Sequence, residues 1–338
     1  MKKYFASKLS TALAAGGALG GGGVTAYNQY FPKTLQEALE REGIAFIESI
    51  EDQNQKGNAY KAIFLDYKNE ISKDINDLKD KTNVESDYSK IKEWCNKLLK
   101  EKYSHSNWKK NKSSLVKYCS DRKPIKVESW LRRIGQTGWI KDSDKSVEEY
   151  KVIFSIYRFS FDFLKIIKSA DPKGVEQQQT TKADEGYPRL QTWCTENLSR
   201  LTSEVEDLTI YSQLTWWCKP LGYDTIEKRI EKMYDGKWEK ESSTNTGTDG
   251  EWEKIKDLWA SDFDVNSYVK QGYKKSDTLT AEEYKNWCEK TLNEKLHADK
   301  AYIAHYKSAK SVCVKFKVQE KLKTTKDLRK AIEEANTN

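Results

Sequence analysis

The sequence predicts an all-α fold of three tandem helical repeat units, each ending in a helical hairpin clipped by a cysteine pair. Two observations support this prediction. The six cysteines form three pairs of nearly equal spacing, and the first cysteine of every pair follows a tryptophan. In addition, aromatic residues recur at helical spacing in a chain of 338 residues that contains only 5 prolines. The pairs are Cys95 with Cys119, Cys194 with Cys218, and Cys288 with Cys313.

The repeat also predicts where the parts of the chain begin and end. Residues 1–31 form a signal peptide or a membrane anchor, and residues 316–338 form a C-terminal helical tail. The three repeat units between them are called modules here: module 1 is 32–122, module 2 is 123–219 and module 3 is 220–315.

The N-terminal segment has the pattern of an export signal. Lys2, Lys3 and Lys8 precede a stretch without charge that is rich in Ala and Gly, and Val24-Thr25-Ala26 offers a small-residue cleavage site. The stretch is also long enough to span a bilayer as a helix. Cleavage and retention as an anchor both remain open, and a flexible arm is the further alternative. Either form of the signal places the body of the protein outside the cytoplasm.

Each module is expected to contain the same order of elements. A short amphipathic segment lies between a proline and a glycine, at Pro32 to Gly43, at Pro124 to Gly135 and, less regularly, at Pro220 to Gly236. A longer helix follows around Tyr60, Tyr150 and Trp252. Loops are predicted over 80–87, 170–188 and 271–280, and a polar insertion over 241–248. The aromatic run from Phe154 to Leu164 is interpreted as helix core.

The Trp-Cys helix and a returning helix close each module. If the chain reverses midway between the cysteines, near Asn107, Glu206 and Lys300, an antiparallel hairpin brings the two thiols side by side. We therefore predict three disulfides, one within each module. Asp299 is predicted to cap the third returning helix. The three tryptophans that precede the first cysteines are predicted to be buried against their own hairpins: Trp94, Trp193 and Trp287.

The charge pattern favours a solvated surface over a nucleic-acid interface. Lys+Arg 59 against Asp+Glu 52 gives a net charge of only +7, and both signs are interleaved. Trp108 with Lys109, Lys110 and Lys112 forms a basic patch, and Arg132-Arg133 follows Trp130. The first patch is not repeated in modules 2 and 3, so we interpret it as a hairpin tip. Nucleic-acid binding is the alternative that a steep salt dependence would reveal.

The histidines and cysteines do not form a common catalytic or metal-binding pattern. The three histidines are His105, His297 and His305, and none belongs to a His-Glu-x-x-His arrangement or lies beside a cysteine. A turn predicted at 298–300 separates His297 from His305. The cysteines lack the Cys-x-x-Cys spacing of zinc sites. We therefore expect no catalytic residues, no metal and no cofactor.

The basic start, the Ala/Gly-rich segment ALAAGGALGGGGVTAY and the repeated Trp-Cys helices resemble the paralogous families of uncharacterised proteins of haemotropic mycoplasmas. The resemblance covers the layout of the whole chain. It implies a membrane-associated or exported location in a wall-less parasite, with a role in surface variation or host contact. It transfers no functional residues.

These observations predict a non-enzymatic interaction protein, antigenic in character, that is either membrane-anchored with an extracellular body or secreted. Its partner is an unidentified protein, which the resemblance places in the host. The alternatives are a cytoplasmic structural scaffold with reduced cysteines and a secreted hydrolase. The hydrolase would require acidic side chains and one histidine to meet in a pocket.

Overall fold

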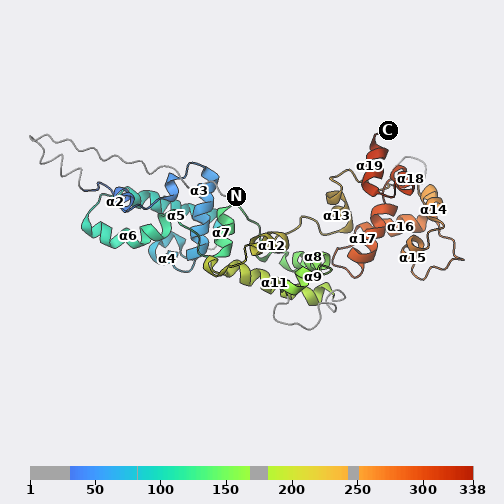
Figure 1. Ribbon diagram of the computed structural model, residues 1–338, viewed down its shortest axis with the longest axis horizontal. Coiled ribbons are helices and arrows are strands. Elements are labelled where there is room, and N and C mark those ends of the chain that lie inside the picture. The colour runs from blue at the N-terminus through green and yellow to red at the C-terminus, as the bar shows by residue number, and fades with distance from the viewer. Residues whose placement is uncertain (1–30, 82, 168–181, 243–250, 338) are drawn as a thin grey trace, which may run out of the picture. The chain divides into compact units, whose positions relative to one another are not determined.

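A computed structural model describes residues 31–81, 83–167, 182–242 and 251–337 and confirms the all-α fold (Figure 1). Within these ranges the only β-type pairing consists of isolated bridges. The predicted signal or anchor segment lies outside the described residues except for Phe31, and so do 170–181 and 243–248 of the predicted loops. None of the helices in the described ranges is both long and apolar enough to cross a bilayer.

The chain divides into two compact units, residues 1–124 and residues 125–338. The division lies close to the predicted boundary between modules 1 and 2. The predicted modules 2 and 3 belong to one compact unit, and the C-terminal tail folds with them. The helices of the first compact unit are α2 (Leu35–Arg41), η1 (Ile47–Ser49), α3 (Gln53–Tyr67), α4 (Ile71–Asp74), η2 (Asn76–Leu78), α5 (Val84–Leu99) and α6 (His105–Cys119).

The second compact unit begins with the elements of module 2. These are α7 (Val127–Arg133), η3 (Ile140–Asp142), α8 (Ser146–Tyr157), α9 (Phe161–Ile167), α11 (Ala183–Ser199), η4 (Thr202–Glu204) and α12 (Thr209–Trp217). Module 3 and the tail follow with α13 (Ile226–Met233), α14 (Trp252–Trp259), α15 (Phe263–Val269), α16 (Ala281–Leu292), η5 (Ala301–His305), α17 (Tyr306–Val312), α18 (Phe316–Thr325) and α19 (Leu328–Asn336).

Side chains at the helix starts explain where several helices begin. Asp52 accepts a hydrogen bond from the amide of Gln55 at the start of α3, and Ser104 accepts one from Asn107 at the start of α6. Thr280 and Glu283 form a complete capping box at the start of α16. These bonds satisfy amides that lack partners within a helix, so each cap fixes the first turn of a helix that carries core residues.

The buried side chains form three hydrophobic clusters, each centred on one cysteine pair. The first cluster joins α2, α3, α5 and α6, and the second joins α7, α8, α9, α11 and α12. The third draws on α13 to α19 and includes Val152 of α8. Aromatic residues such as Tyr60, Tyr150 and Tyr284 are fully buried in these clusters. They provide the core volume that the sparse aliphatic residues do not supply.

The same backbone pairing ties the start of each module to its Trp-Cys hairpin. The residue before the first short helix forms an isolated antiparallel bridge with the turn of the hairpin, and the first helical amide donates to a carbonyl in that turn. The bridges are Thr34 with Lys102, Lys126 with Leu201, and Thr225 with Lys295. The amide bonds run from Leu35 to Glu101 (3.0 Å), from Val127 to Arg200 (2.9 Å) and from Ile226 to Glu294 (3.1 Å).

Two helix starts differ from the predicted loops. The loop predicted over 170–188 ends before Ala183, because α11 begins there and contains both Gly186 and Pro188. The packing of α11 on the buried ring of Phe154 outweighs the low helical preference of these two residues. The loop predicted over 80–87 is also too long, since α5 begins at Val84 with the side chain of Asn83 as its cap. The loop over 271–280 contains no helix.

Candidate functional site

Each of the three cysteine pairs identified in the sequence forms a disulfide. The Cα atoms are 5.7 Å apart in Cys95–Cys119, 5.7 Å apart in Cys194–Cys218 and 5.5 Å apart in Cys288–Cys313. No free cysteine remains, and all six side chains are buried. The disulfides join the two helices of each hairpin within the core, so the sulfur atoms have a structural role and are not exposed for chemistry.

The tryptophans that precede the first cysteines differ in burial. Trp287 is buried, whereas Trp94 and Trp193 are half-buried, so the prediction of burial was wrong for these two. Both still pack against their own hairpins: Trp94 lies 6.0 Å from the ring of Tyr118, and Trp193 lies 5.5 Å from that of Trp217. Both tryptophans therefore pack against the edge of their hydrophobic cluster.

The hairpin turns were predicted correctly in two modules. Module 1 reverses between Leu99 and His105, so Asn107 lies in the first turn of α6 and not in the loop. Glu206 and Lys300 do lie in the turns of modules 2 and 3. Asp299 does not cap the third returning segment. Lys300 holds that position with φ of 64°, and its side chain makes no capping bond.

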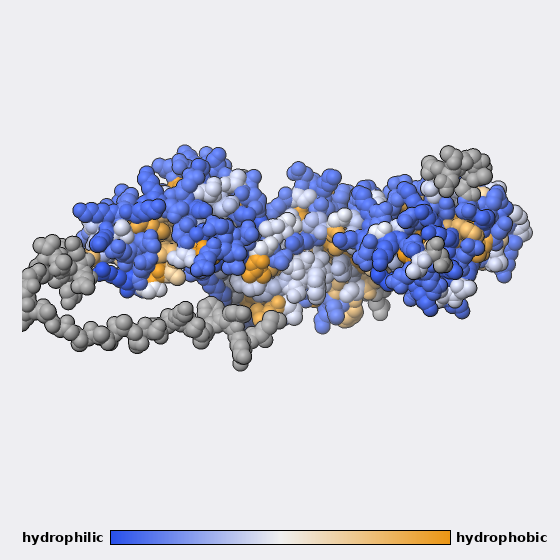
Figure 2. Space-filling view, turned by 90° about the horizontal axis from the view of Figure 1, so that it is seen from above, coloured by the Kyte–Doolittle hydropathy of each residue, from blue (hydrophilic) through white to orange (hydrophobic). Residues whose placement is uncertain are grey.

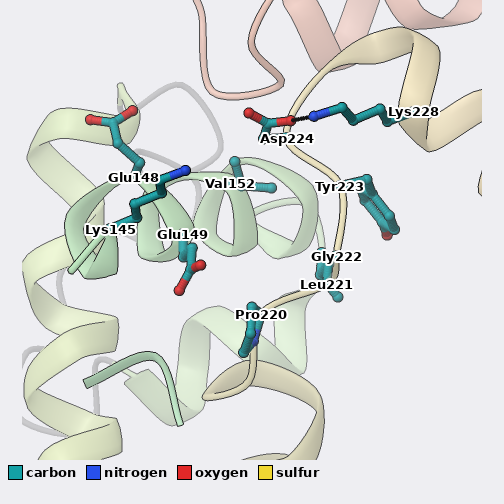
Figure 3. Close-up of a pocket in the computed structure, with 10 residues that line it drawn as sticks. All are labelled: Lys145, Glu148, Glu149, Val152, Pro220, Leu221, Gly222, Tyr223, Asp224 and Lys228. Atoms are coloured by element: carbon teal, nitrogen blue, oxygen red, sulfur yellow. Dashed lines mark hydrogen bonds and ion pairs between the residues drawn. The ribbon is translucent and has the colours of Figure 1, made fainter. Parts of the chain in front are cut away.

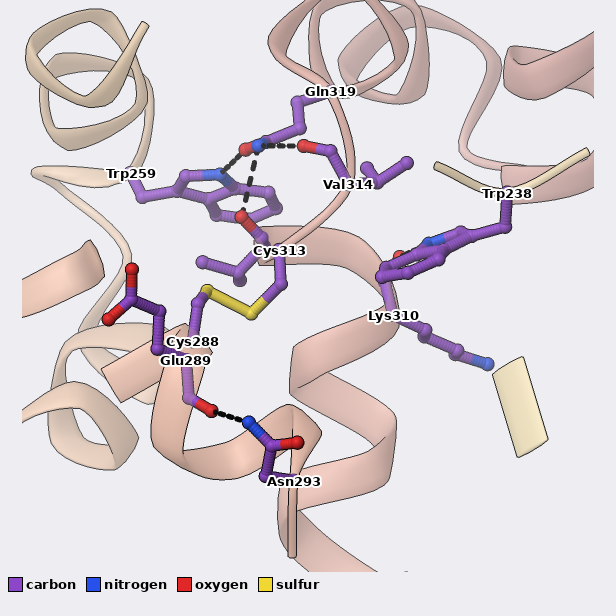
Figure 4. Close-up of a disulfide and its surroundings, with 10 residues drawn as sticks. Trp238, Trp259, Cys288, Glu289, Asn293, Lys310, Cys313, Val314 and Gln319 are labelled. Carbon is purple, nitrogen blue, oxygen red and sulfur yellow. Dashed lines mark hydrogen bonds between the residues drawn. A yellow bond between two sulfur atoms is a disulfide. The ribbon is translucent and has the colours of Figure 1, made fainter. Parts of the chain in front are cut away.

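The third disulfide is surrounded by a hydrogen-bond network from the C-terminal tail (Figure 4). Gln319 of α18 is fully buried and donates from Nε2 to the carbonyl oxygens of Val312 (3.0 Å) and Val314 (2.6 Å). Its Oε1 accepts from the indole Nε1 of Trp259 at 2.6 Å. The network fixes the backbone on both sides of Cys313, so the tail is part of the module 3 core.

A cavity of about 220 Å³ lies where α8 meets residues 220–224 (Figure 3). Most of its charged groups already have partners within the protein. Asp224 accepts hydrogen bonds from Lys228 (2.8 Å) and from Lys295, and these bonds lower the pKa of Asp224 to about 2. Glu148 contacts Lys151 (3.2 Å) and His297 (3.0 Å). The cavity therefore borders an ion-pair cluster, and Oε2 of Glu149 in its lining is buried without a hydrogen-bond partner in the described structure.

A larger groove of about 620 Å³ lies on module 3 and forms the candidate site. It is bordered by α15, by the loop after it, by α16 and by η5. Its lining combines apolar and aromatic surface with polar side chains, namely Ser267, Tyr268, Val269, Gln271, Glu283, Asn286, Trp287, Lys290, Thr291, Glu294, Lys300, Ala304 and His305. A concave surface with an aromatic part and several converging polar groups is the usual form of a ligand site.

The backbone of module 3 departs from that of the other modules at this groove. The returning segment is α-helical from its start in α6 and α12, but in module 3 it begins with η5, the only π-helix among the described residues. The amide of His305 bonds to the carbonyl of Lys300 at 3.3 Å, five residues earlier. Single turns of π-helix and left-handed residues with side chains cost free energy and occur frequently at functional sites.

The spacing of the third cysteine pair reflects the altered backbone of module 3. The stretch from the bridge to the second cysteine has the same length in modules 1 and 2, where it runs from Lys102 to Cys119 and from Leu201 to Cys218. In module 3 it runs from Lys295 to Cys313 and is one residue longer. The additional residue therefore lies between the bridge and Cys313, in the stretch that contains the turn and the π-helix. The groove was not predicted from the sequence, although the wider third cysteine spacing was visible there.

The groove brings one histidine and two carboxylates together. Nδ1 of His305 lies 2.6 Å from a carboxylate oxygen of Glu294. Glu283 accepts from the amide of Thr280 at 2.8 Å as part of the capping box. His297 lies outside the groove, beyond the turn at 298–300, and His105 begins α6 in the first compact unit. The described residues contain no metal-ligating group of three or more His, Cys, Asp or Glu side chains.

The predicted basic patch on module 1 is partly neutralised. Nζ of Lys112 lies 2.7 Å from the carboxylate of Glu42 and 4.9 Å from the ring centroid of Trp108. Hydrophilic side chains cover much of the face shown in Figure 2, with apolar residues in small separate areas. This arrangement is typical of a mixed-charge solvated surface.

Comparison of the chain with protein-family models, with curated proteins and with solved structures gives no match.

Proposed function

We propose that the chain is an exported, non-enzymatic interaction protein that binds a partner through the groove of module 3. It is displayed at a membrane surface through its N-terminal segment or secreted after cleavage. The three modules form a scaffold stabilised by disulfides. The groove lies where the backbone of module 3 differs from that of the other two modules, and it is the binding site.

The observation that carries the proposal is the pairing of all six cysteines in buried disulfides within the modules. Disulfides form and persist in oxidising compartments, and the thiols of cytosolic proteins are kept reduced. A ring closed by each crosslink stabilises the fold by about 3 kcal/mol in the chain-entropy model. Such stabilisation is valuable in small helical modules whose surfaces carry many charges.

The recurring backbone bridges support a second part of the proposal. The same hydrogen-bonded contacts occur around each Trp-Cys hairpin, and the structural differences lie in loops and in the returning segment. We infer that one module was copied three times and that its copies diverged at the surface. This is the pattern expected if the scaffold is kept while recognition changes.

The proposal is tested by counting thiols in the protein isolated from its native source. Alkylation under denaturing, non-reducing conditions is expected to label none of the six cysteines, and alkylation after reduction is expected to label all six. Protease treatment of intact cells, followed by mass spectrometry of the released peptides, should recover peptides from all three modules. Six labelled thiols without reduction would show that the chain is a cytoplasmic scaffold instead.

A secreted hydrolase is the second candidate, and one observation favours it. Glu294 contacts Nδ1 of His305, and this arrangement orients the ring and leaves Nε2 as a general base at the groove. We expect no turnover of ester, peptide or glycoside substrates by the full-length protein. Turnover that disappears in a His305→Gln variant with unchanged thermal stability would establish the hydrolase and overturn the non-enzymatic proposal.

A further inference from the structure

We propose that the groove of module 3 binds a carboxylated saccharide. The inference rests on the proposed function, because it names the chemical class of the partner that the groove would recognise. Three properties of the lining carry it: the charges that remain unpaired, the planar hydrogen-bonding side chains and the aromatic surface.

The charged side chains in the groove that lack both a hydrogen-bonding and an ion-pairing partner are positive. Each carboxylate has a hydrogen-bonding partner: Glu294 contacts His305, and Glu283 accepts from the amide and the hydroxyl of Thr280. Across the described part of the chain, the ammonium groups of Lys290 and Lys300 have no hydrogen-bonding or ion-pairing partner. Two free ammonium groups at one concave surface attract an anionic group, and a carboxylate is a suitable acceptor for them.

The same groove offers groups suited to hydroxyls. The side-chain amides of Gln271 and Asn286 also lack partners among the described residues, and each presents a carbonyl acceptor and two N–H donors. A saccharide hydroxyl both donates and accepts, so an amide satisfies it in either direction. An acidic peptide would pair its carboxylates with the lysines but would leave most of the donors and acceptors of these two amides without hydrogen bonds.

Aromatic surface completes the site. Trp287 is 9% exposed, Tyr268 is 38% exposed, and both line the groove with Val269 and Ala304. A pyranose ring has one face of C–H groups that packs on aromatic and aliphatic carbon while its hydroxyls point outward. The combination of aromatic surface, amides and free ammonium groups therefore fits a sugar that carries a carboxylate better than it fits a neutral sugar.

The backbone of the site is held in place before any ligand binds. Lys300 adopts φ of 64°, and η5 follows it directly with Ala304 and His305 in the lining. Cys288 and Cys313 crosslink α16 to the returning segment, and these two elements contribute most of the polar groups. Such pre-organisation lowers the entropy lost on binding.

The test is a calorimetric titration of the full-length, disulfide-intact protein with three probes. Sialyllactose carries the carboxylated sugar, lactose lacks it, and hexaglutamate represents an acidic peptide. We expect sialyllactose to bind about tenfold or more tightly than either of the others, since a charge-assisted contact contributes on that scale. Equal binding of lactose, tighter binding of hexaglutamate, or no binding of sialyllactose would overturn the inference.

Two variants locate the binding in the groove. Lys290→Ala removes one ammonium group, and Lys300→Gly removes the other while retaining a residue that readily adopts positive φ. Each is expected to weaken sialyllactose binding about tenfold. The matched control is Lys97→Ala in module 1, because Lys97 follows Cys95 by two residues as Lys290 follows Cys288. This control should bind as the unchanged protein does.

The outcomes separate this inference from the proposed function. Variants that melt normally and bind sialyllactose like the unchanged protein would show that the sugar binds elsewhere, which overturns the assignment to the groove. Intact disulfides and surface exposure without saccharide binding would leave the exported interaction protein standing and overturn only the ligand class.

Discussion

Gly186 shows how one residue sets the distance between two helices. It lies inside α11, and a Cβ added at this position would lie 2.0 Å from a ring carbon of Phe154 on α8. Phe154 is fully buried at the centre of the second hydrophobic cluster, so its ring has no room to move away. The absence of a side chain therefore lets the two helices pack against each other.

Replacing Gly186 by alanine is expected to lower the free energy of unfolding by about 1–3 kcal/mol, because overpacking strains a filled core. The measurement is urea denaturation of the disulfide-intact protein. Gly57→Ala in α3 is the matched control, since its added Cβ meets only Tyr88, with the hydroxyl oxygen at 3.7 Å and the nearest ring carbons at 3.9 Å. That change should raise the free energy of unfolding by about 0.5–1 kcal/mol, because alanine has a higher helix preference than glycine. Equal effects of the two substitutions would contradict this account.

His297 is a second residue whose surroundings have a measurable consequence. Burial lowers the pKa of its imidazole, and the charges that face it are Glu148 and Lys151 of α8, Asp184 of α11 and Lys295 of its own segment. The Nδ1 atom is buried without a hydrogen-bond partner in the described structure. Protonation in the folded state is therefore unfavourable.

Because the folded-state pKa is lowered, the unfolded chain takes up this proton first as the pH falls through the ordinary histidine value of about 6.5. Stability that is present above that value is then lost on acidification. Melting temperatures between pH 7.5 and pH 5 should fall less steeply in His297→Gln than in the unchanged protein. The exposed histidine of α6 gives the control, His105→Gln, which should retain the steeper fall. A steeper fall in His297→Gln would reverse the assigned sign.

At the scale of elements, α18 illustrates how a segment beyond the repeats becomes part of a module. Val318 and Gln319 are buried, and Gln319 alone satisfies the indole of Trp259 and two backbone carbonyls near Cys313. The tail therefore completes the core of module 3 with a polar contact as well as an apolar one. Modules 1 and 2 contain no equivalent of this helix in the described structure.

Gln319→Ala should lower the free energy of unfolding of the second compact unit by about 2 kcal/mol, because it leaves buried polar groups without partners. Denaturation followed by tryptophan fluorescence measures the change, since Trp259 loses its hydrogen bond. The neighbouring exposed residue provides the control, Glu320→Ala, which should change stability by less than about 0.5 kcal/mol. A loss as large in the control would show that the effect does not come from the buried hydrogen bonds of Gln319.

At the scale of the whole molecule, each crosslink is confined to one module. The first disulfide lies in the first compact unit, and the other two lie in the second. The stabilising effect of each disulfide should therefore be local.

Replacing both Cys95 and Cys119 by alanine is expected to destabilise the first compact unit by about 3 kcal/mol and to leave the second unchanged. Hydrogen exchange followed by mass spectrometry measures the stability of the two compact units separately, because each peptide comes from one unit. The matched control replaces Cys194 and Cys218, and it should reduce protection only in the second compact unit. Loss of protection throughout the chain in both variants would show that the crosslinks act globally.

The sequence predicted the features that depend on local pattern. Helical spacing of aromatic residues indicated the all-α fold, and equal cysteine spacing indicated which thiols lie together. It did not predict that α11 begins before Gly186 and Pro188, because that start depends on the distant ring of Phe154. It also did not predict the groove, because the lining comes from three separate segments whose proximity is set by tertiary packing. The longer third cysteine separation was the one local sign of it.

The crosslinked hairpins also determine how the chain responds to mechanical force. A disulfide between residues 24 or 25 apart keeps the chain between them from being drawn out when the ends are pulled. At about 3.5 Å per extended residue, each module withholds about 80 Å of extension. The maximum extension of the oxidised chain is therefore shorter by about a fifth than that of the same chain after reduction.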